Sequence, residues 1–471
     1  MEKTTLVLIT LVAYKLLLIG IGFWASRRNS DEEDFFLGGR GLGPVVAAIS
    51  YSSSASSAWT LLGLSGAAYM LGLRVVWIAL GSIIGMFVAW FWIGPRLRVY
   101  SREKGNLTLT DFLAEGSGGG TRRAIVLCTS IIIIFTFAFY VAAQFQGAGN
   151  TFSSTFDLGM TESILIGAAI IMIYTLLGGF WAVSVTDTVQ GLLMAFTAVL
   201  LPVAALMEVG GFSGFWQGLQ AVSTPAQLSL TGGNAGLMAV GVIVGSLSIG
   251  FGTYGQPHLL VRFMALRDDS ALRQARLITI VWYLVVFLGM VFVGLVGHVL
   301  HAGIDNPETI FFVLTESLFT PIIGAVLLAA VLSAIMSTAD SQLLVAASAI
   351  SHDLGLGGER NRLLYSRLAI VMLVVFAVLV SLYLPEAIFS RVLFAWIALG
   401  SAFGPTVFAR LAGVPLQPRG VLASILTGFG LAVTFYLLPN TPGDILERLV
   451  PFCAALAVLL MVRARHGGLG P

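Results

Sequence analysis

Two long apolar stretches of this sequence are interrupted by small polar residues. One carries a serine-rich run at residues 50–59, and the other carries glycines, serines and a threonine at residues 245–257. Such interruptions predict broken helices, whose freed backbone groups are tolerated in hydrocarbon only where they line a cavity or meet a ligand. Freed carbonyls and hydroxyls suit a hard monovalent cation, and half-helix N-termini suit a carboxylate. The alternative is that small residues merely allow close helix packing, but a matched pair favours a transport site.

A third stretch supplies hydroxyl groups that match the first break. Ser337, Thr338 and Ser341 fall on one face of a helix because they lie three and four positions apart. The alternative for such hydroxyls is a hydrogen bond back to their own helix.

Two carboxylates, Asp187 and Asp340, lie well inside apolar stretches. Each costs about 2.5–3.5 kcal/mol at the bilayer centre, so a partner is expected. For Asp340 we favour a role with an ion or a proton. Asp187 has a second interpretation, a carboxylate at a helix N-terminus that faces cytoplasmic water. Lys15 lies midway along the first apolar stretch and receives no role.

The composition defines the class of protein that must hold these residues. The chain has 471 residues, of which 57% are hydrophobic and 10% charged, and its net charge is +2. These values exclude a soluble domain and a disordered chain, and they make nucleic acid an improbable partner. We expect an all-α polytopic membrane protein with 13 spans. The expected spans are 5–25, 43–72, 74–95, 123–149, 161–180, 184–207, 234–260, 277–302, 321–351, 364–384, 386–411, 420–438 and 447–463.

The basic residues predict an orientation in the membrane. Most of the 25 Lys and Arg residues fall in alternate connecting segments, including a group made of Arg262, Arg267, Arg273 and Arg276. The positive-inside rule then puts the N-terminus outside and the C-terminus in the cytoplasm. The two interrupted spans are five apart, so they cross in opposite directions, as in inverted repeats. We expect a peripheral first helix and cytoplasmic loop (1–42), a first five-helix repeat (43–207), an external loop (208–233), a second, inverted repeat (234–411) and two peripheral helices (412–471).

Several motifs resemble those of the sodium:solute symporter family, and within it those of its bacterial sodium/proline branch. The resemblance runs from about residue 5 to residue 411. The motifs are Phe36-Leu37-Gly38-Gly39-Arg40 with Leu42-Gly43-Pro44, Leu107-Thr108-Leu109-Thr110-Asp111-Phe112, Gly178-Gly179-Phe180 with Thr186-Asp187-Thr188-Val189-Gln190, Gly255-Gln256-Pro257-His258 with Arg262-Phe263-Met264-Ala265, and Met336-Ser337-Thr338 with Gln342-Leu343-Leu344.

The resemblance implies a LeuT-type 5+5 inverted repeat with two discontinuous helices, and it implies roles for particular residues. The family's sodium site falls on backbone oxygens of Ser53, Ser56 and Ala334 and on the hydroxyls of Ser337 and Thr338. A second cation or proton site, present in some members, falls on Asp187, Asp340 and Ser341. Substrate contacts fall on Trp59 and Tyr140. Together with the two breaks they give a substrate set of Ser54, Ser57, Trp59, Tyr140, Ile249, Thr253 and Gln256.

The chain departs from the proline branch at the expected substrate and cation sites. Ala55 replaces an aspartate, and Ile249 and Thr253 replace a tryptophan and a tyrosine. Asp340 stands where relatives carry a hydroxyl; it either takes over the charge missing at Ala55 or takes a proton.

We therefore expect a sodium-coupled symporter, with Na⁺ as coupling ion, that imports a small solute such as a proline-like amino acid. It is expected to work as a monomer in the inner membrane and not to be an enzyme. The alternatives are a proton-coupled or monocarboxylate transporter of the same fold, and a membrane sensor without transport.

Overall fold

The computed structural model describes residues 3–26, 37–177, 179–355, 358–384, 386–438 and 441–462. Phe36 and Gly178, two of the motif residues, lie outside this part of the chain. In chain order, the first half forms α1 (Lys3–Ser26), η1 (Gly38–Arg40), α3 (Pro44–Ala58), η2 (Trp59–Leu64), α4 (Ser65–Leu71), η3 (Gly72–Val75), α5 (Val76–Val88), η4 (Ala89–Ile93), α6 (Gly94–Lys104), α7 (Leu109–Ala114), α8 (Gly119–Phe156), α9 (Met160–Leu177), α10 (Phe180–Glu208) and α11 (Gly211–Val222).

The second half is also helical. It forms α12 (Gly236–Leu247), η5 (Ser248–Gly255), α13 (Pro257–Ala265), α14 (Asp269–Leu300), η6 (Pro307–Thr309), α15 (Ile310–Leu318), α16 (Pro321–Ser348), η7 (Ala349–Asp353), α17 (Gly358–Tyr383), α18 (Ile388–Leu411), α19 (Pro418–Tyr436), η8 (Pro442–Asp444), α20 (Ile445–Arg448) and α21 (Val450–Met461). The described residues contain no strand beyond an isolated bridge between Leu42 and Leu266. The all-α prediction is confirmed.

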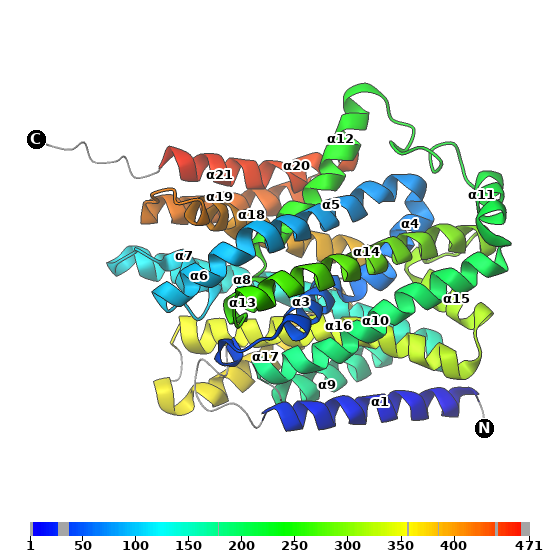
Figure 1. The fold of residues 1–471 in the computed structure, drawn as a ribbon, viewed down its shortest axis with the longest axis horizontal. Coiled ribbons are helices and arrows are strands. Elements are labelled where there is room, and N and C mark those ends of the chain that lie inside the picture. Colours follow the sequence, from blue (N-terminus) through cyan, green and yellow to red (C-terminus); the bar gives the residue numbers. More distant parts are fainter. Residues whose placement is uncertain are drawn as a thin grey trace, which may run out of the picture.

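Ten helical tracts in the described residues are long and apolar enough to cross a membrane. One of them, Pro44–Lys104, turns back at Gly72, whose φ of +66° favours glycine, so it contains two expected spans (Figure 1). The shorter apolar helix Met160–Ile173 matches the fifth expected span. The last expected span corresponds to α20 and to α21, which has only 12 residues. The count of 13 therefore stays a prediction.

Both serine- and glycine-rich stretches are broken in the structure. In α3 the backbone leaves helical geometry at Ser57, with φ 47° and ψ −174°, and the chain continues as a π-helix in η2. In the second stretch α12 gives way to the 3₁₀ segment η5, and Gln256 is extended before α13 begins. Polar backbone groups are thus freed in the interior at both places.

Small residues allow the second break to pack against its neighbours backbone to backbone. A methyl group added at Gly250 would lie 2.5 Å from the carbonyl oxygen of Gly81 on α5. One added at Gly252 would lie 1.9 Å from the Trp396 ring on α18. Glycine is therefore required here for close approach, as is usual between helices in membranes.

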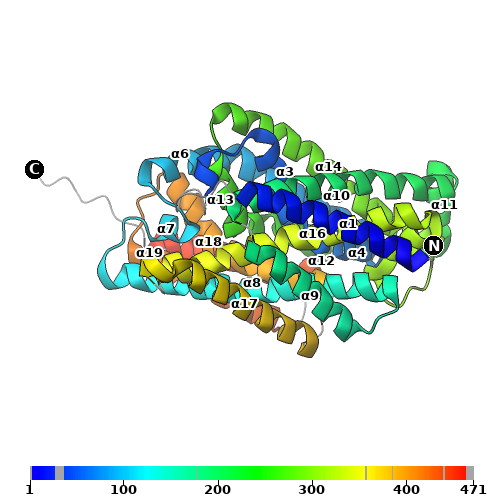
Figure 2. The ribbon, with the colours of Figure 1, turned by 90° about the horizontal axis from the view of Figure 1, so that it is seen from below.

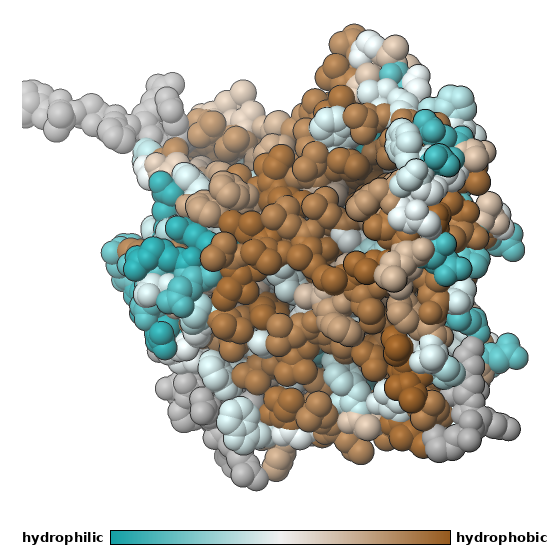
Figure 3. Space-filling model, turned by 45° about the vertical axis from the view of Figure 1, so that its right-hand side comes forward, coloured by the Kyte–Doolittle hydropathy of each residue, from teal (hydrophilic) through white to brown (hydrophobic). Residues whose placement is uncertain are grey.

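The helices run roughly parallel, with α1 at one margin and α19 and α21 at the opposite margin (Figure 1). The view turned by 90° also shows α1 lying along the outside of α10 and α16 (Figure 2). A broad apolar band covers the visible face, and polar residues gather at its two ends (Figure 3). This distribution is that of a protein surrounded by lipid.

Candidate functional site

The break in α3 brings the first discontinuous helix into contact with α16. In an unbroken helix the Ala58 amide would donate to the Ser54 carbonyl. Here the Ala58 amide donates to Gln144 Oε1 at 3.0 Å, and the Ser54 carbonyl accepts instead from Thr338 Oγ1 at 2.9 Å. Ser54 Oγ lies 3.0 Å from the carbonyl oxygen of Ser337. The two segments that the sequence paired, about three hundred residues apart, therefore meet at the break.

The five expected sodium ligands come from these two segments. All of them are buried, and Ser337 Oγ donates weakly to the Ala334 carbonyl at 3.3 Å within its own helix. Ser53 Oγ lies 3.2 Å from the main-chain oxygen of Asp187 on α10. Ser56 Oγ has no hydrogen-bond partner among the described residues. Buried hydroxyl and carbonyl oxygens such as these are the type of ligand that a hard cation prefers.

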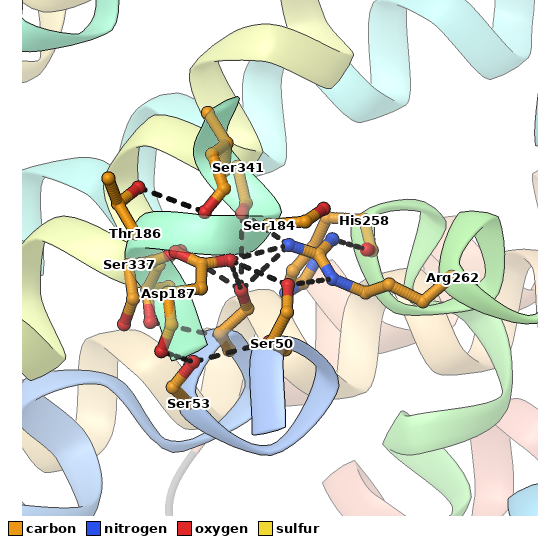
Figure 4. A network of polar contacts seen from close by, with 12 residues as sticks. Ser50, Ser53, Ser184, Thr186, Asp187, His258, Arg262, Ser337 and Ser341 are labelled. Carbon is orange, nitrogen blue, oxygen red and sulfur yellow. Dashed lines mark hydrogen bonds and ion pairs between the residues drawn. The ribbon is translucent and has the colours of Figure 1, made fainter. Parts of the chain in front are cut away.

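Asp187 is held by a buried arginine (Figure 4). Arg262 Nη2 donates to Asp187 Oδ2 at 2.9 Å, and both side chains are almost fully buried. The same nitrogen lies 2.7 Å from Ser341 Oγ, and Nε donates to Ser50 Oγ at 3.0 Å. Arg262 therefore occupies the space between Asp187 and Ser341 that the sequence assigned to a second cation.

Two sequence interpretations are corrected by this pair. Asp187 does not face cytoplasmic water, because it is 0% exposed and ion-paired. Arg262 does not belong to a connecting segment; it lies in α13, which follows the second break and packs against α3. The signal that could have revealed it was its position only five residues after Pro257, too close to the break to reach the membrane surface.

The third residue of the expected second cation site, Asp340, makes no hydrogen bond to Asp187 or Arg262. Its carboxylate is 0% exposed and accepts no hydrogen bond from another side chain among the described residues. Across from it lies α1, whose Lys15 contacts Met336 Sδ one helical turn before Asp340. Lys15 received no role in the sequence analysis, and the structure places it against α16.

A small cavity lies beside the break in α3. Four of the expected substrate residues line it, namely Trp59, Tyr140, Ile249 and Thr253. Three do not: Ser54 faces Asp187, Ser57 Oγ accepts from the Tyr140 hydroxyl at 3.4 Å, and Gln256 Nε2 donates to the carbonyls of Gly252 and Trp396. The sequence missed the other lining residues, which are Ala55, Ser82, Tyr283, Phe287, Val392, Leu393 and Trp396.

One side of the cavity is lined by α18, through Val392, Leu393 and Trp396. Phe389 stacks on Trp59 with ring centroids 5.8 Å apart, and a second, wider cavity lies beyond Phe389 and Leu393. Glu308 fixes this helix start, because its carboxylate accepts from the amides of Phe389 at 2.9 Å and Ile388 at 3.1 Å. Burial raises the pKa of the Glu308 carboxyl above its usual value, although these two amides oppose the shift.

At the other end of the bundle a polar cluster joins α7 to η7. Ligand-type atoms of Asp111, His352 and Asp353 lie within 4.8 Å of one another. Each already has a protein partner: Asp111 closes a capping box with Thr108, His352 bonds to Asp111, and Asp353 accepts from Thr108. Burial acts to raise the pKa of Asp111, but hydrogen bonds from His352 and two backbone amides outweigh it and hold that pKa below its usual value. These contacts hold α7 against η7.

Comparison with known proteins agrees with this fold. A 97% share of the chain superposes on 98% of a structure entitled a substrate-bound outward-open state of a Na⁺-coupled sialic acid symporter, with a TM-score of 0.78 and 16% identity. The closed Mhp1 nucleobase-cation-symport-1 family transporter matches 91% of the chain and 94% of its own length, with a TM-score of 0.58 and 14% identity. The fold is that of the LeuT-type transporters.

The sequence profile of the sodium:solute symporter family matches residues 35–428. The osmoregulated proline transporter OpuE of Bacillus subtilis is 36% identical over 433 residues, which cover 90% of this chain and 87% of OpuE. Sodium/proline symporter 2 of Staphylococcus saprophyticus is 34% identical over 89% of this chain and 84% of its own length. The chain belongs to the sodium:solute symporter family. It is a multi-pass, sodium-coupled solute transporter and not an enzyme, and sodium is its coupling ion.

Proposed function

We propose that this protein imports a small zwitterionic amino acid, proline or a close analogue, together with sodium. One observation carries the proposal: the solute cavity and the cation ligands belong to the same break. Trp59 lines the cavity two residues after Ser57, and Ser54, three residues before it, bonds to Thr338 on α16. A solute on one side of the break and an ion on the other therefore act on a single backbone element.

The cavity lining supports a compact solute with an apolar ring and a cationic amine. Trp59, Tyr140, Tyr283, Phe287 and Trp396 give it an aromatic wall. Such a wall packs against an aliphatic ring and attracts a cation through the ring faces. The buried Trp59 Nε1 has no hydrogen-bond partner among the described residues, so it offers a donor to a carboxylate.

The differences from the proline branch lie in the same wall. Ile249 and Thr253 both line the cavity, so two aromatic rings of the proline branch are replaced there by smaller side chains. We therefore include larger ring-substituted analogues in the solute class. Relatives whose names include proline support proline itself as the solute, and competition experiments distinguish proline from the larger analogues.

The proposed sodium ligands are Ser53, Ser56, Ala334, Ser337 and Thr338. An ion held by them joins α3 to α16 and stabilises the conformation that presents the cavity to the solute, so ion and solute raise each other's affinity. One charge crossing 100 mV gains about 2.3 kcal/mol. A tenfold sodium gradient adds about 1.4 kcal/mol, and the sum supports about 500-fold accumulation of a neutral solute.

The proposal also includes the orientation of the chain in the membrane, its monomeric state and its two repeats. The N-terminus lies outside and the C-terminus in the cytoplasm, so Glu308 and Phe389 face the exterior and Asp111 faces the cytoplasm. The protein acts as a monomer in the inner membrane, surrounded by lipid. Residues 43–207 and 234–411 form the two inverted repeats, and transport proceeds by alternating access around the two broken helices.

The experiment is uptake of radiolabelled proline into proteoliposomes that contain the purified protein. An inward sodium gradient is expected to drive accumulation, while equal potassium or proton gradients are not. Unlabelled ring-substituted prolines are expected to compete, and Trp59→Ala is expected to lower solute affinity while sodium still stabilises the protein. Accumulation driven by a pH gradient and unaffected by sodium would contradict the proposal in favour of proton coupling.

A further inference from the structure

Two charged side chains lie in the membrane-spanning part without a described salt-bridge partner. Asp340 on α16 is 0% exposed, and Lys15 on α1 is half-buried midway along a helix of 24 residues. An ion in this environment is costly unless an opposite charge lies nearby. Lys15 and Asp340 are close enough to interact electrostatically, and Asp340 interacts in the same way with Asp187, which repels it, and with Arg262, which attracts it.

The faces of α1 and α16 that touch each other carry both charges. Tyr14 and Ser333 lie 2.5 Å apart through their hydroxyl oxygens, and Lys15 contacts the sulfur of Met336. Ser333, Met336 and Asp340 follow one another at spacings of three and four residues, so they form one stripe along α16. The stripe that α1 covers therefore leads directly to the Asp340 carboxylate.

The present neighbour of the Lys15 ammonium cannot neutralise it. A thioether sulfur is a weak acceptor without charge. The flexible four-carbon stem of lysine carries a point charge that can reach along the helix surface by about one turn. The carboxylate that lies one turn from Met336 on the covered stripe is Asp340.

We propose that Lys15 is the built-in counter-ion of Asp340 and that, together with Arg262 at Asp187, it takes the place of a mobile second cation. The pair positions α1 against the helix that carries the sodium ligands. The charges of the interior support this assignment. Asp187 is ion-paired with Arg262, and Asp340 is a second buried anion nearby, so a second cation is needed to balance the charges. A further sodium ion at Asp187, Asp340 and Ser341 would leave a net positive charge in a dry core, which is unfavourable. The consequence for ion coupling rests on the proposed function; the ion pair itself does not.

The test is a double-mutant cycle on the full-length protein, with Lys15→Met, Asp340→Asn and the double variant. Each single variant leaves one unpaired charge, so we expect uptake to fall by about tenfold and the midpoint of thermal unfolding in detergent to drop. The double variant is expected to recover to within about threefold of the parent in uptake. Leu16→Met, on the exposed side of the same helix, is the matched control and is expected to change neither quantity.

A second measurement separates a counter-ion from a purely structural contact. In Lys15→Met the uncovered carboxylate takes a sodium ion from solution, so uptake depends on sodium concentration more steeply than in the parent. The double variant is expected to return to the shallower dependence. A contact that only holds α1 in place would lower uptake without changing this steepness.

The opposite results overturn the proposal. If Lys15→Met behaves like the parent while Asp340→Asn and the double variant fail equally, Asp340 acts without Lys15. If the parent itself shows no sodium-driven uptake, the proposed function fails, but the thermal cycle still measures the pair. Additive losses of thermal stability in the double variant would then show that Lys15 and Asp340 do not interact.

Discussion

The contact between Thr338 and the break in α3 yields the sharpest test of the proposed sodium site. Thr338→Val keeps the shape of the side chain and removes the hydroxyl that donates to the Ser54 carbonyl at 2.9 Å. Ser337→Ala removes another proposed ligand, whose hydroxyl, among the described residues, bonds within its own helix at 3.3 Å. The two variants therefore lose the same kind of ligand but differ in what they do to the sodium-free protein.

The magnitudes follow from these contacts. Leaving the buried Ser54 carbonyl unpaired costs about 1–3 kcal/mol, so Thr338→Val destabilises the protein even without sodium. Ser337→Ala loses one weak bond and costs about 0.5 kcal/mol. If one ligand contributes about 1.4 kcal/mol, both variants raise the Kd for sodium by about tenfold. At a sodium concentration of 100 times the parent Kd, the stabilisation by sodium then falls from about 2.7 to about 1.4 kcal/mol.

The assay is thermal unfolding of the purified protein over a series of sodium concentrations, with choline replacing sodium at constant ionic strength. Both variants are expected to show about half of the parent's sodium-induced stabilisation, and only Thr338→Val is expected to start from a lower midpoint. The matched control is Thr175→Val, a buried threonine on α9 that bonds to its own helix. An unchanged sodium response in both variants would refute the site.

Three further predictions concern the surroundings of the site. Glu308→Gln weakens the charge-assisted bonds that hold Phe389 against Trp59, so we expect uptake to fall several-fold. In the parent, uptake should also decrease as external pH is lowered, with a midpoint above pH 4.5, because Glu308 then becomes protonated; an identical pH profile in the variant would contradict this role. Because the folded-state pKa of Glu308 is raised, protonation favours the folded chain as pH falls, so this loss is not unfolding. Gly250→Ala brings a methyl group against the backbone of α5 and should abolish the folded yield in size-exclusion chromatography; a normal yield would disprove the close packing. Arg262→Met leaves Asp187 buried and unpaired at a cost of about 3–5 kcal/mol, and adding Asp187→Asn should restore much of the thermal stability, unless the pair is not formed.

The two helix breaks of this fold could be predicted because they depend on residue type. Serine and glycine at residues 50–59 and 245–257 mark both breaks, since free backbone groups must be satisfied wherever they occur in lipid. The hydroxyls of Ser337 and Thr338 were matched to the first break by the same chemistry. These features follow from composition and spacing, and they need no knowledge of how the helices are rotated.

What could not be predicted depends on that rotation. Arg262 was assigned to a connecting segment because basic residues usually mark segment ends, yet α13 folds inward after the break and carries it to Asp187. Tyr283, Phe287 and Trp396 lie in ordinary apolar helices, and nothing in their sequence separates a cavity wall from a lipid-facing ring. In water a helix reveals its buried face by an apolar stripe, whereas in lipid both faces are apolar. Lys15 shows the same limit: its charge predicts that it needs a partner, but only the packing of α1 against α16 identifies Asp340 as the candidate.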